Sequence, residues 1–337
     1  MELLKPMALS RGDAIGMISP SARLNANQLS RVASNARFLE KRGYKVKLGK
    51  NLRKGYGHNA GTVEERLDDL HSMFEDGEVA AIMASRGGYN SNELLDRIDY
   101  GLVRRNPKIF CGFSDITFMH CALHKKTGLV SFYGPMGVTL FDLPEPAGDY
   151  MYRRFHEVVA EGRSRLELRQ SKGFTNSWGS RRVDLKRQRR TSWKALRPGV
   201  AKGALAGGHI YTILNLAGTG YFPDLDGRIL FWEDTESTTA HTERYLWQLR
   251  MMGVFDRISG MLVGRPNADE YKTMDRSYGL DRVILDATKG YDFPIITSMD
   301  FGHTLPMMTL PYGIMAEMRS SHRGSSLALL ESAVTRP

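Results

Sequence analysis

Short apolar runs alternate with segments of helical periodicity along the first half of the chain. Apolar residues recur at intervals of three and four positions in 29–39 and again in 67–74, which predicts two amphipathic helices. Thr62 and Glu65 have the spacing of a capping box in front of the second helix. Strands separated by helices of this length predict a doubly wound, mainly parallel sheet. Continuous apolar runs place its strands at residues 14–20, 44–48, 79–85 and 108–113.

The pattern changes after about residue 160. Residues 163–200 are polar and basic and end near a Pro-Gly pair, as is typical of a loop, linker or insertion. We therefore expect an α/β protein with an N-terminal domain at 1–162, a basic linker or substrate loop at 163–200, and a smaller C-terminal α/β domain with more strand at 201–337. Strand patterns in this last part cover residues 227–231, 258–263, 294–298 and 325–330, with a helical pattern at 245–252.

The composition excludes several classes of protein. The chain has 337 residues, of which 42% are hydrophobic and 25% charged, enough for a large core and typical of two soluble domains. Two cysteines, Cys111 and Cys121, exclude a disulfide scaffold and a CxxC motif. The first eleven residues lack the apolar core of a signal peptide, and the uncharged run 203–223 contains too many glycines and polar residues for a membrane span. We expect a cytoplasmic protein with no membrane partner.

The charge of the chain is concentrated in one interval. Lys and Arg number 47 against 37 Asp and Glu, a net charge of +10, which suggests an acidic partner. Residues 181–197 hold eight Lys or Arg against Asp184, a net of +7, so the other 320 residues carry only +3. The chain also lacks the known nucleic-acid-binding signatures. A loop that steers a small anionic substrate is therefore favoured over a nucleic-acid partner, and a solvated basic loop is the alternative.

Ser114 stands between the apolar run at 108–113 and a helical pattern at 115–126. A serine on a sharp turn from strand to helix is exposed, and the helix N-terminus offers N–H groups to an oxyanion. The alternative is a helix N-cap serine. Gly87 and Gly88 follow another strand pattern, where their amides can complete an oxyanion hole or simply form a turn.

Two further side chains follow apolar strand patterns in the second half. Glu233 directly follows the strand pattern at 228–232, and His303 follows the run at 294–298. Together with Ser114 they form a coherent set, in which His303 takes the serine proton and Glu233 holds the imidazole tautomer. A structural histidine is the alternative. The chain contains no HExxH, GxGxxG or Walker motif, so we expect neither a metal nor a cofactor.

Nine motifs in a fixed order resemble those of the serine-type LD-carboxypeptidase and microcin C immunity carboxypeptidase family. They occupy residues 11–21, 86–95, 112–117, 133–136, 203–208, 230–234, 253–256, 302–306 and 310–313. Each motif alone is weak, whereas their order over some 300 residues makes the resemblance specific. It implies a cytoplasmic serine carboxypeptidase-like hydrolase, so that a nucleic-acid-binding protein and a catalytically silent relative are the less favoured classes.

The resemblance also implies roles for individual residues. It implies a triad of Ser114, Glu233 and His303, with an oxyanion hole formed by the amides of Asp115 and of one glycine of the Gly87-Gly88 pair, assigned to Gly88. The nucleophile would come from the first domain and the other two residues from the second. The family is expected to form homodimers. One departure is His209, where the family usually has asparagine after two glycines.

The basic segment resembles the tryptophan-bearing loop of the microcin C immunity enzymes, in which an aromatic residue stacks on the nucleobase of the substrate. Trp193 is the first choice for that role and Trp178 the second, with packing of the loop against its domain as the alternative for both. Stacking on a base contributes on the order of 1–3 kcal/mol. We therefore expect a peptidyl- or aminoacyl-nucleotide substrate, with an LD-carboxypeptidase activity on murein tetrapeptide as the alternative.

Overall fold

The computed structural model describes residues 2–139, 141, 147–176, 192–267 and 278–336 of the chain. These residues belong to two compact units. The first unit comprises Met1–Arg163, Thr309–Gly313 and Ser332–Pro337, and the second comprises Ser164–Met308 and Ile314–Glu331. In the described ranges, no helix is both long enough and apolar enough to cross a membrane.

The first unit is built on a six-stranded sheet with the order β12-β5-β4-β3-β1-β2 across the described residues. All neighbours pair in parallel except β12, which runs antiparallel to β5. The strands are β1 (Ala14–Ile18), β2 (Lys45–Leu48), β3 (Val79–Ala84), β4 (Ile109–Gly112), β5 (Phe132–Tyr133) and β12 (Leu310–Pro311). The helices are α1 (Ala26–Glu40), α2 (Val63–Glu75), η1 (Ser91–Arg97), α3 (Tyr100–Arg105), η2 (Ser114–Ile116), α4 (Thr117–Thr127) and α5 (Ala147–Val159).

Local sequence signals account for much of this unit. β1, β3 and β4 lie inside the apolar runs that predicted them, and their side chains are almost entirely buried. The capping box at Thr62 is confirmed, because its side chain accepts from the Glu65 N–H and the Glu65 side chain accepts from the Thr62 N–H. The predicted doubly wound, mainly parallel sheet is therefore confirmed.

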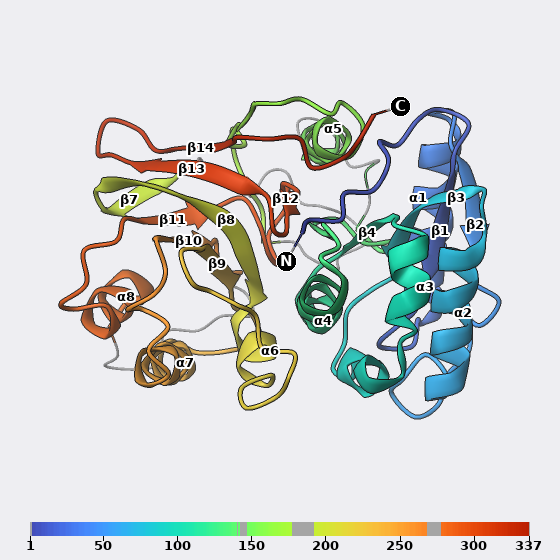
Figure 1. The fold of residues 1–337 in the computed structure, drawn as a ribbon, viewed down its shortest axis with the longest axis horizontal. Helices are drawn as coiled ribbons and strands as arrows, with labels where there is room; N and C mark the ends of the chain where they lie inside the picture. The colour runs from blue at the N-terminus through green and yellow to red at the C-terminus, as the bar shows by residue number, and fades with distance from the viewer. Residues whose placement is uncertain (1, 140, 142–146, 177–191, 268–277, 337) are drawn as a thin grey trace. The chain divides into compact units, whose positions relative to one another are not determined.

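The second unit has an eight-stranded sheet in its described part, with the order β6-β14-β13-β8-β9-β10-β11-β7. Four adjacent strands, β8 to β11, are parallel, and antiparallel strands flank them on both sides (Figure 1). The strands are β6 (Leu166–Leu168), β7 (Lys194–Arg197), β8 (Gly199–His209), β9 (Ile229–Glu233), β10 (Gly260–Gly264), β11 (Ile295–Met299), β13 (Met315–Ser320) and β14 (Ser326–Leu329). The helices are α6 (Ile210–Leu214), α7 (Thr239–Met251) and α8 (Leu280–Ala287).

This second α/β unit with more strand agrees with the expected fold class, but the segment 163–200 differs from a plain linker. It contains β6, which pairs with β14, β7, which pairs with β11, and the start of β8, which pairs with β13. β6 and β7 stand at the two edges of the sheet, where short polar strands are common and carry little sequence signal. The boundaries expected at 162 and 200 stay a prediction. The compact units also place 309–313 and 332–337 with the N-terminal part.

Candidate functional site

Ser114 lies on a turn between β4 and the helix α4. Its backbone has a positive φ of 63°, a conformation that L-residues adopt rarely and that costs on the order of 1–3 kcal/mol. Its N–H donates to the Tyr133 hydroxyl at 3.3 Å, and Phe113 rather than Ser114 occupies the N-cap position of the short helix η2. This arrangement differs from the N-cap alternative, because Ser114 is neither of the two N-cap residues on this turn and has a strained backbone.

The predicted glycine pair lies beside this turn. A Cβ built on Gly87 would stand 3.0 Å from the Ser114 Cβ and 3.3 Å from the Asp115 backbone nitrogen, and one built on Gly88 would stand 2.5 Å from the Ser21 Oγ. Only glycine leaves room for such a close approach of two backbones. The structure therefore brings Gly87 next to Ser114 and the Asp115 amide, and packs Gly88 against Ser21.

The side chain of Asp115 anchors the Ser114 turn to neighbouring segments by hydrogen bonds. Its buried carboxylate accepts from the Ser21 hydroxyl at 2.6 Å and from the Ser91 N–H at 2.9 Å, while the Ser91 hydroxyl donates to the Asp115 carbonyl. Burial raises the pKa of Asp115, and the two hydrogen-bonding serines and the nearby Arg66 guanidinium oppose that rise. These bonds join the loops that follow β1 and β3 to the Ser114 turn.

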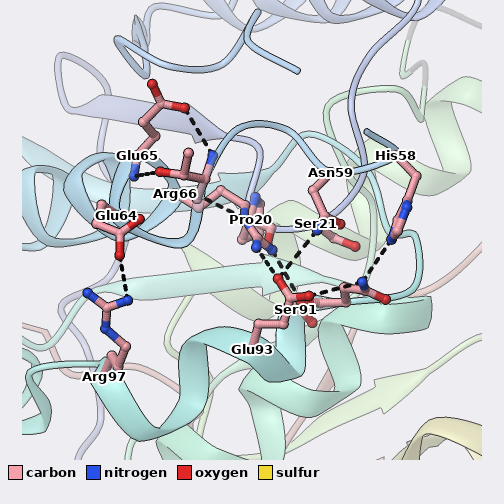
Figure 2. A network of polar contacts seen from close by, with 12 residues as sticks. Pro20, Ser21, His58, Asn59, Glu64, Glu65, Arg66, Ser91, Glu93 and Arg97 are labelled. Atoms are coloured by element: carbon pink, nitrogen blue, oxygen red, sulfur yellow. Dashed lines mark hydrogen bonds and ion pairs between the residues drawn. The ribbon is translucent and has the colours of Figure 1, made fainter. Parts of the chain in front are cut away.

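Arg66 is a buried cation at the centre of the same polar network (Figure 2). Its guanidinium donates to the carbonyl oxygens of Pro20 and Asn90 and forms an ion pair with Glu93. It therefore links helix α2 to the two loops that surround Asp115. A buried charge is tolerated when every donor finds an acceptor.

Replacing Arg66 by methionine should lower the free energy of unfolding by about 3 kcal/mol, because it leaves buried carbonyl oxygens without a donor. The matched control is Arg97→Met. Arg97 pairs with Glu64 at 2.7 Å, but both side chains are more than half exposed, so the loss should stay under about 1 kcal/mol. Urea unfolding at constant pH measures both values, and equal losses would contradict the proposed importance of burial.

A second buried group supports β4 from within the first unit. His120 in α4 bonds the Gly112 carbonyl through Nε2 at 2.9 Å and the Ser131 hydroxyl through Nδ1 at 2.8 Å. Burial lowers the pKa of His120 to about 4, so the ring is neutral near pH 7. Because a carbonyl only accepts, Nε2 carries the proton. His120 thus fixes the strand end two residues before Ser114.

The second unit brings together the predicted carboxylate and histidine. Glu233 is the last residue of β9, His303 follows β11, and the His303 Nδ1 lies 2.8 Å from the Glu233 Oε2. Both residues are buried, with exposed fractions of 1% and 8%. Gly302 permits this contact, since a Cβ there would stand 2.7 Å from the same carboxylate oxygen. The contact with the carboxylate engages the Nδ1 atom of the His303 ring.

A second histidine and carboxylate lie next to this pair. The ring of His209, at the end of β8, stands 6.1 Å from the His303 ring centre, and its Nε2 is 3.9 Å from the Asp234 Oδ1. Burial lowers the pKa of His209 to about 4 and raises the pKa of Asp234 to about 6. His209, the position at which the chain departs from the expected asparagine, therefore places a neutral imidazole beside the Glu233–His303 pair near pH 7.

Trp193 is buried within the second unit. It is 5% exposed, and its indole N–H donates to the Asp300 carboxylate at 2.9 Å. This is the geometry of the packing alternative, and a stacking role would require the ring to be uncovered. Trp178 and six of the eight basic residues of 181–197 lie outside the described residues. The other two, Lys194 and Arg197, contact Asp281 and Thr288 of the same unit.

Ser114 with its glycine pair thus belongs to the first unit, and the Glu233–His303 pair belongs to the second. Among the described residues, no group of three or more His, Cys, Asp or Glu has a metal-binding arrangement.

Sequence reasoning missed several buried charges, among them Arg66, Arg265 and Asp300. Arg66 lies on the buried face of an amphipathic helix, together with Leu67 and Leu70, a position where a charge signals a polar partner. Arg265 and Asp300 directly follow the parallel strands β10 and β11. Opposite charges just past two such strands predict an ion pair, and this signal was present in the sequence.

Two family descriptions match the chain. LD-carboxypeptidase N-terminal domain matches residues 15–134, and LD-carboxypeptidase C-terminal domain matches residues 202–318. The chain is 33% identical over 331 residues to a probable murein peptide carboxypeptidase of Bacillus subtilis, covering 98% of this chain and 95% of that one. It is 29% identical over 340 residues to the microcin C7 self-immunity protein MccF of Escherichia coli, covering 96% and 95%.

Solved structures show the same two similarities. MccF in complex with glutamyl sulfamoyl guanosine superposes with a TM-score of 0.92 at 27% identity, covering 98% of this chain and 100% of that one. A muramoyltetrapeptide carboxypeptidase from Oxalobacter formigenes superposes with a TM-score of 0.77 at 27% identity, covering 96% and 99%.

Proposed function

This chain belongs to the LD-carboxypeptidase family of serine-type carboxypeptidases, and from that premise we propose that Ser114, Glu233 and His303 are its catalytic triad. The observation that carries the proposal is the 2.8 Å contact between the Glu233 carboxylate and His303. The positive φ of Ser114 supports it from the other unit. The chemistry requires the serine hydroxyl to reach Nε2 of the histidine.

In the proposed mechanism, His303 Nε2 takes the proton of Ser114 while Oγ attacks the carbonyl carbon of the substrate. The oxyanion that forms is bound by the backbone N–H groups of Asp115 and Gly88. The bond from carbon to the leaving nitrogen then breaks, and the imidazolium returns its proton to that nitrogen. Water, activated by His303, attacks the acyl-enzyme and releases the second product, so that Ser114 regains its proton. Glu233 stabilises the imidazolium in both halves.

The substrate class we favour is a peptidyl- or aminoacyl-nucleotide. The TM-score of 0.92 to MccF, over nearly the full length of both chains, supports it, as do the structures of that protein with glutamyl sulfamoyl guanosine and aspartyl sulfamoyl adenosine. The basic interval 181–197 supplies charge that attracts an anionic substrate.

A murein tetrapeptide is the second candidate. It is favoured by the 33% identity to the Bacillus subtilis relative, which is named a probable murein peptide carboxypeptidase. Both candidates contain an acyl carbon bonded to nitrogen that a serine nucleophile can attack, so the triad does not decide between them. The decision rests on what the site binds beside the scissile bond.

A cleavage panel read by mass spectrometry separates the two candidates. Purified protein is incubated with a murein tetrapeptide, with a microcin C-like peptide-nucleotide conjugate and with aspartyl sulfamoyl adenosine. We expect release of the amino acid from the aspartyl nucleotide at the highest kcat/KM. Loss of the terminal residue from the tetrapeptide alone would establish the murein reading instead. Cleavage of neither class would contradict the proposed substrates.

A further inference from the structure

Asp300 accepts hydrogen bonds from three separate segments of the second unit. It is completely buried and lies three residues before His303. The Ser171 N–H and hydroxyl donate to it at 2.9 and 2.6 Å, the Trp193 indole N–H at 2.9 Å and the Arg265 guanidinium at 2.7 Å. A buried carboxylate of this kind is held in place by its donors, because the loss of one donor leaves a negative charge without a hydrogen bond in an apolar environment.

The same segments also hold the other side of the His303 turn. Thr175 and Leu305 exchange two backbone hydrogen bonds at 2.7 and 3.0 Å. The Asn267 amide donates to the His303 carbonyl at 3.1 Å, and the Arg265 guanidinium contacts the Thr304 hydroxyl at 3.4 Å. The turn from 300 to 305 is therefore fixed before, at and after His303.

Arg265 connects these two sets of contacts. Its guanidinium pairs with Asp300 and also lies 4.1 Å from the centre of the Phe174 ring. Its side chain is 5% exposed, so the ion pair is shielded from solvent and its geometry is restricted. The strands β10 and β11 and the segment 171–176 thus meet at one charged contact.

From these contacts we propose that Asp300 is a positioning residue for His303, and that Trp193 acts on the catalytic base through its indole N–H to Asp300. The inference rests on the proposed triad and deepens it, since it assigns to Trp193 a role independent of any nucleobase. The reason is distance along the chain: only Phe301 and Gly302 separate Asp300 from His303. If Asp300 is displaced, the imidazole of His303 moves away from the Glu233 carboxylate oxygen.

Trp193→Phe tests the proposal, because phenylalanine keeps an aromatic ring at this position and removes the donated N–H together with the rest of the second indole ring. We expect kcat to fall about tenfold, since small misplacements of a catalytic group are costly, while KM stays within about twofold. The fall should be the same on every substrate that the wild-type protein cleaves. An unchanged kcat, or a KM increase confined to the sulfamoyl nucleotide, would overturn the proposal.

A double-mutant cycle adds a readout that general destabilisation does not move. Asp300→Asn should lower kcat further than Trp193→Phe, and the double variant should match Asp300→Asn within about twofold, because both act through one bond. Fully multiplicative losses would contradict this. Trp247→Phe is the matched control: Trp247 is 40% exposed on α7 and should keep the wild-type kcat.

Two further variants keep the result interpretable. If Trp193→Phe does not fold, Ser171→Ala removes the 2.6 Å hydroxyl donor to Asp300 and should show the same loss of kcat at constant KM; an unchanged kcat would overturn the proposal. Ser114→Ala, measured in parallel, tests the triad itself. A Trp193→Phe variant with the wild-type kcat beside an inactive Ser114→Ala rejects the positioning role alone, whereas an active Ser114→Ala rejects the triad.

Discussion

Replacing Ser114 by alanine should lower kcat by on the order of 10⁶, because the substitution removes the attacking oxygen and nothing else. The backbone conformation should survive, since alanine and serine carry the same Cβ and meet the same strain at the φ of 63°. Steady-state hydrolysis and mass-spectrometric detection of the acyl-enzyme both measure the effect. The variant should bind substrate and form no covalent adduct.

A second serine provides the control for stability. Ser298 has a φ of 61°, close to that of Ser114, so Ser298→Ala measures what the exchange costs in a left-handed backbone. The thermal midpoints of the two variants should shift by similar small amounts. Hydrolysis by Ser114→Ala at the wild-type rate would show that another residue is the nucleophile, while membership of the carboxypeptidase family would stand.

Replacing Glu233 by glutamine should lower kcat by on the order of 10⁴. The carboxylate accepts the Nδ1 proton of His303 at 2.8 Å and so leaves Nε2 able to accept a proton. The glutamine amide can donate to Nδ1 instead, which moves the ring proton to Nε2, and it offers no negative charge to the imidazolium. Steady-state kinetics on the substrate found by the cleavage panel measures this loss.

Asp234→Asn is the comparison for Glu233→Gln. Asp234 is the next residue and is also buried, but it accepts from the Thr242 hydroxyl at 2.7 Å, and its Oδ1 lies 3.9 Å from Nε2 of His209. We expect a much smaller loss of kcat from this variant. Equal losses would mean that the negative charge of the region matters, and that the specific bond to His303 does not.

Much of the first unit was predictable because its signals are local. A capping box needs only Thr62 and Glu65, and the strands β1, β3 and β4 are apolar on both faces, as central parallel strands must be. The edge strands β6 and β7 were missed for the opposite reason. Their residues are partly polar, and they become strands because β14 and β11 offer unpaired backbone groups.

The sequence by itself determined the types of residue in the candidate site and the strand ends that carry them, since each follows an apolar run. Only the tertiary structure decided that Glu233 and His303, 70 positions apart, are in contact, that Ser114 has a positive φ, and that Trp193 is buried against Asp300. Periodicity reports which face of an element is apolar. It carries no information on which distant backbone or charge that face will meet, and those long-range contacts set the geometry on which catalysis depends.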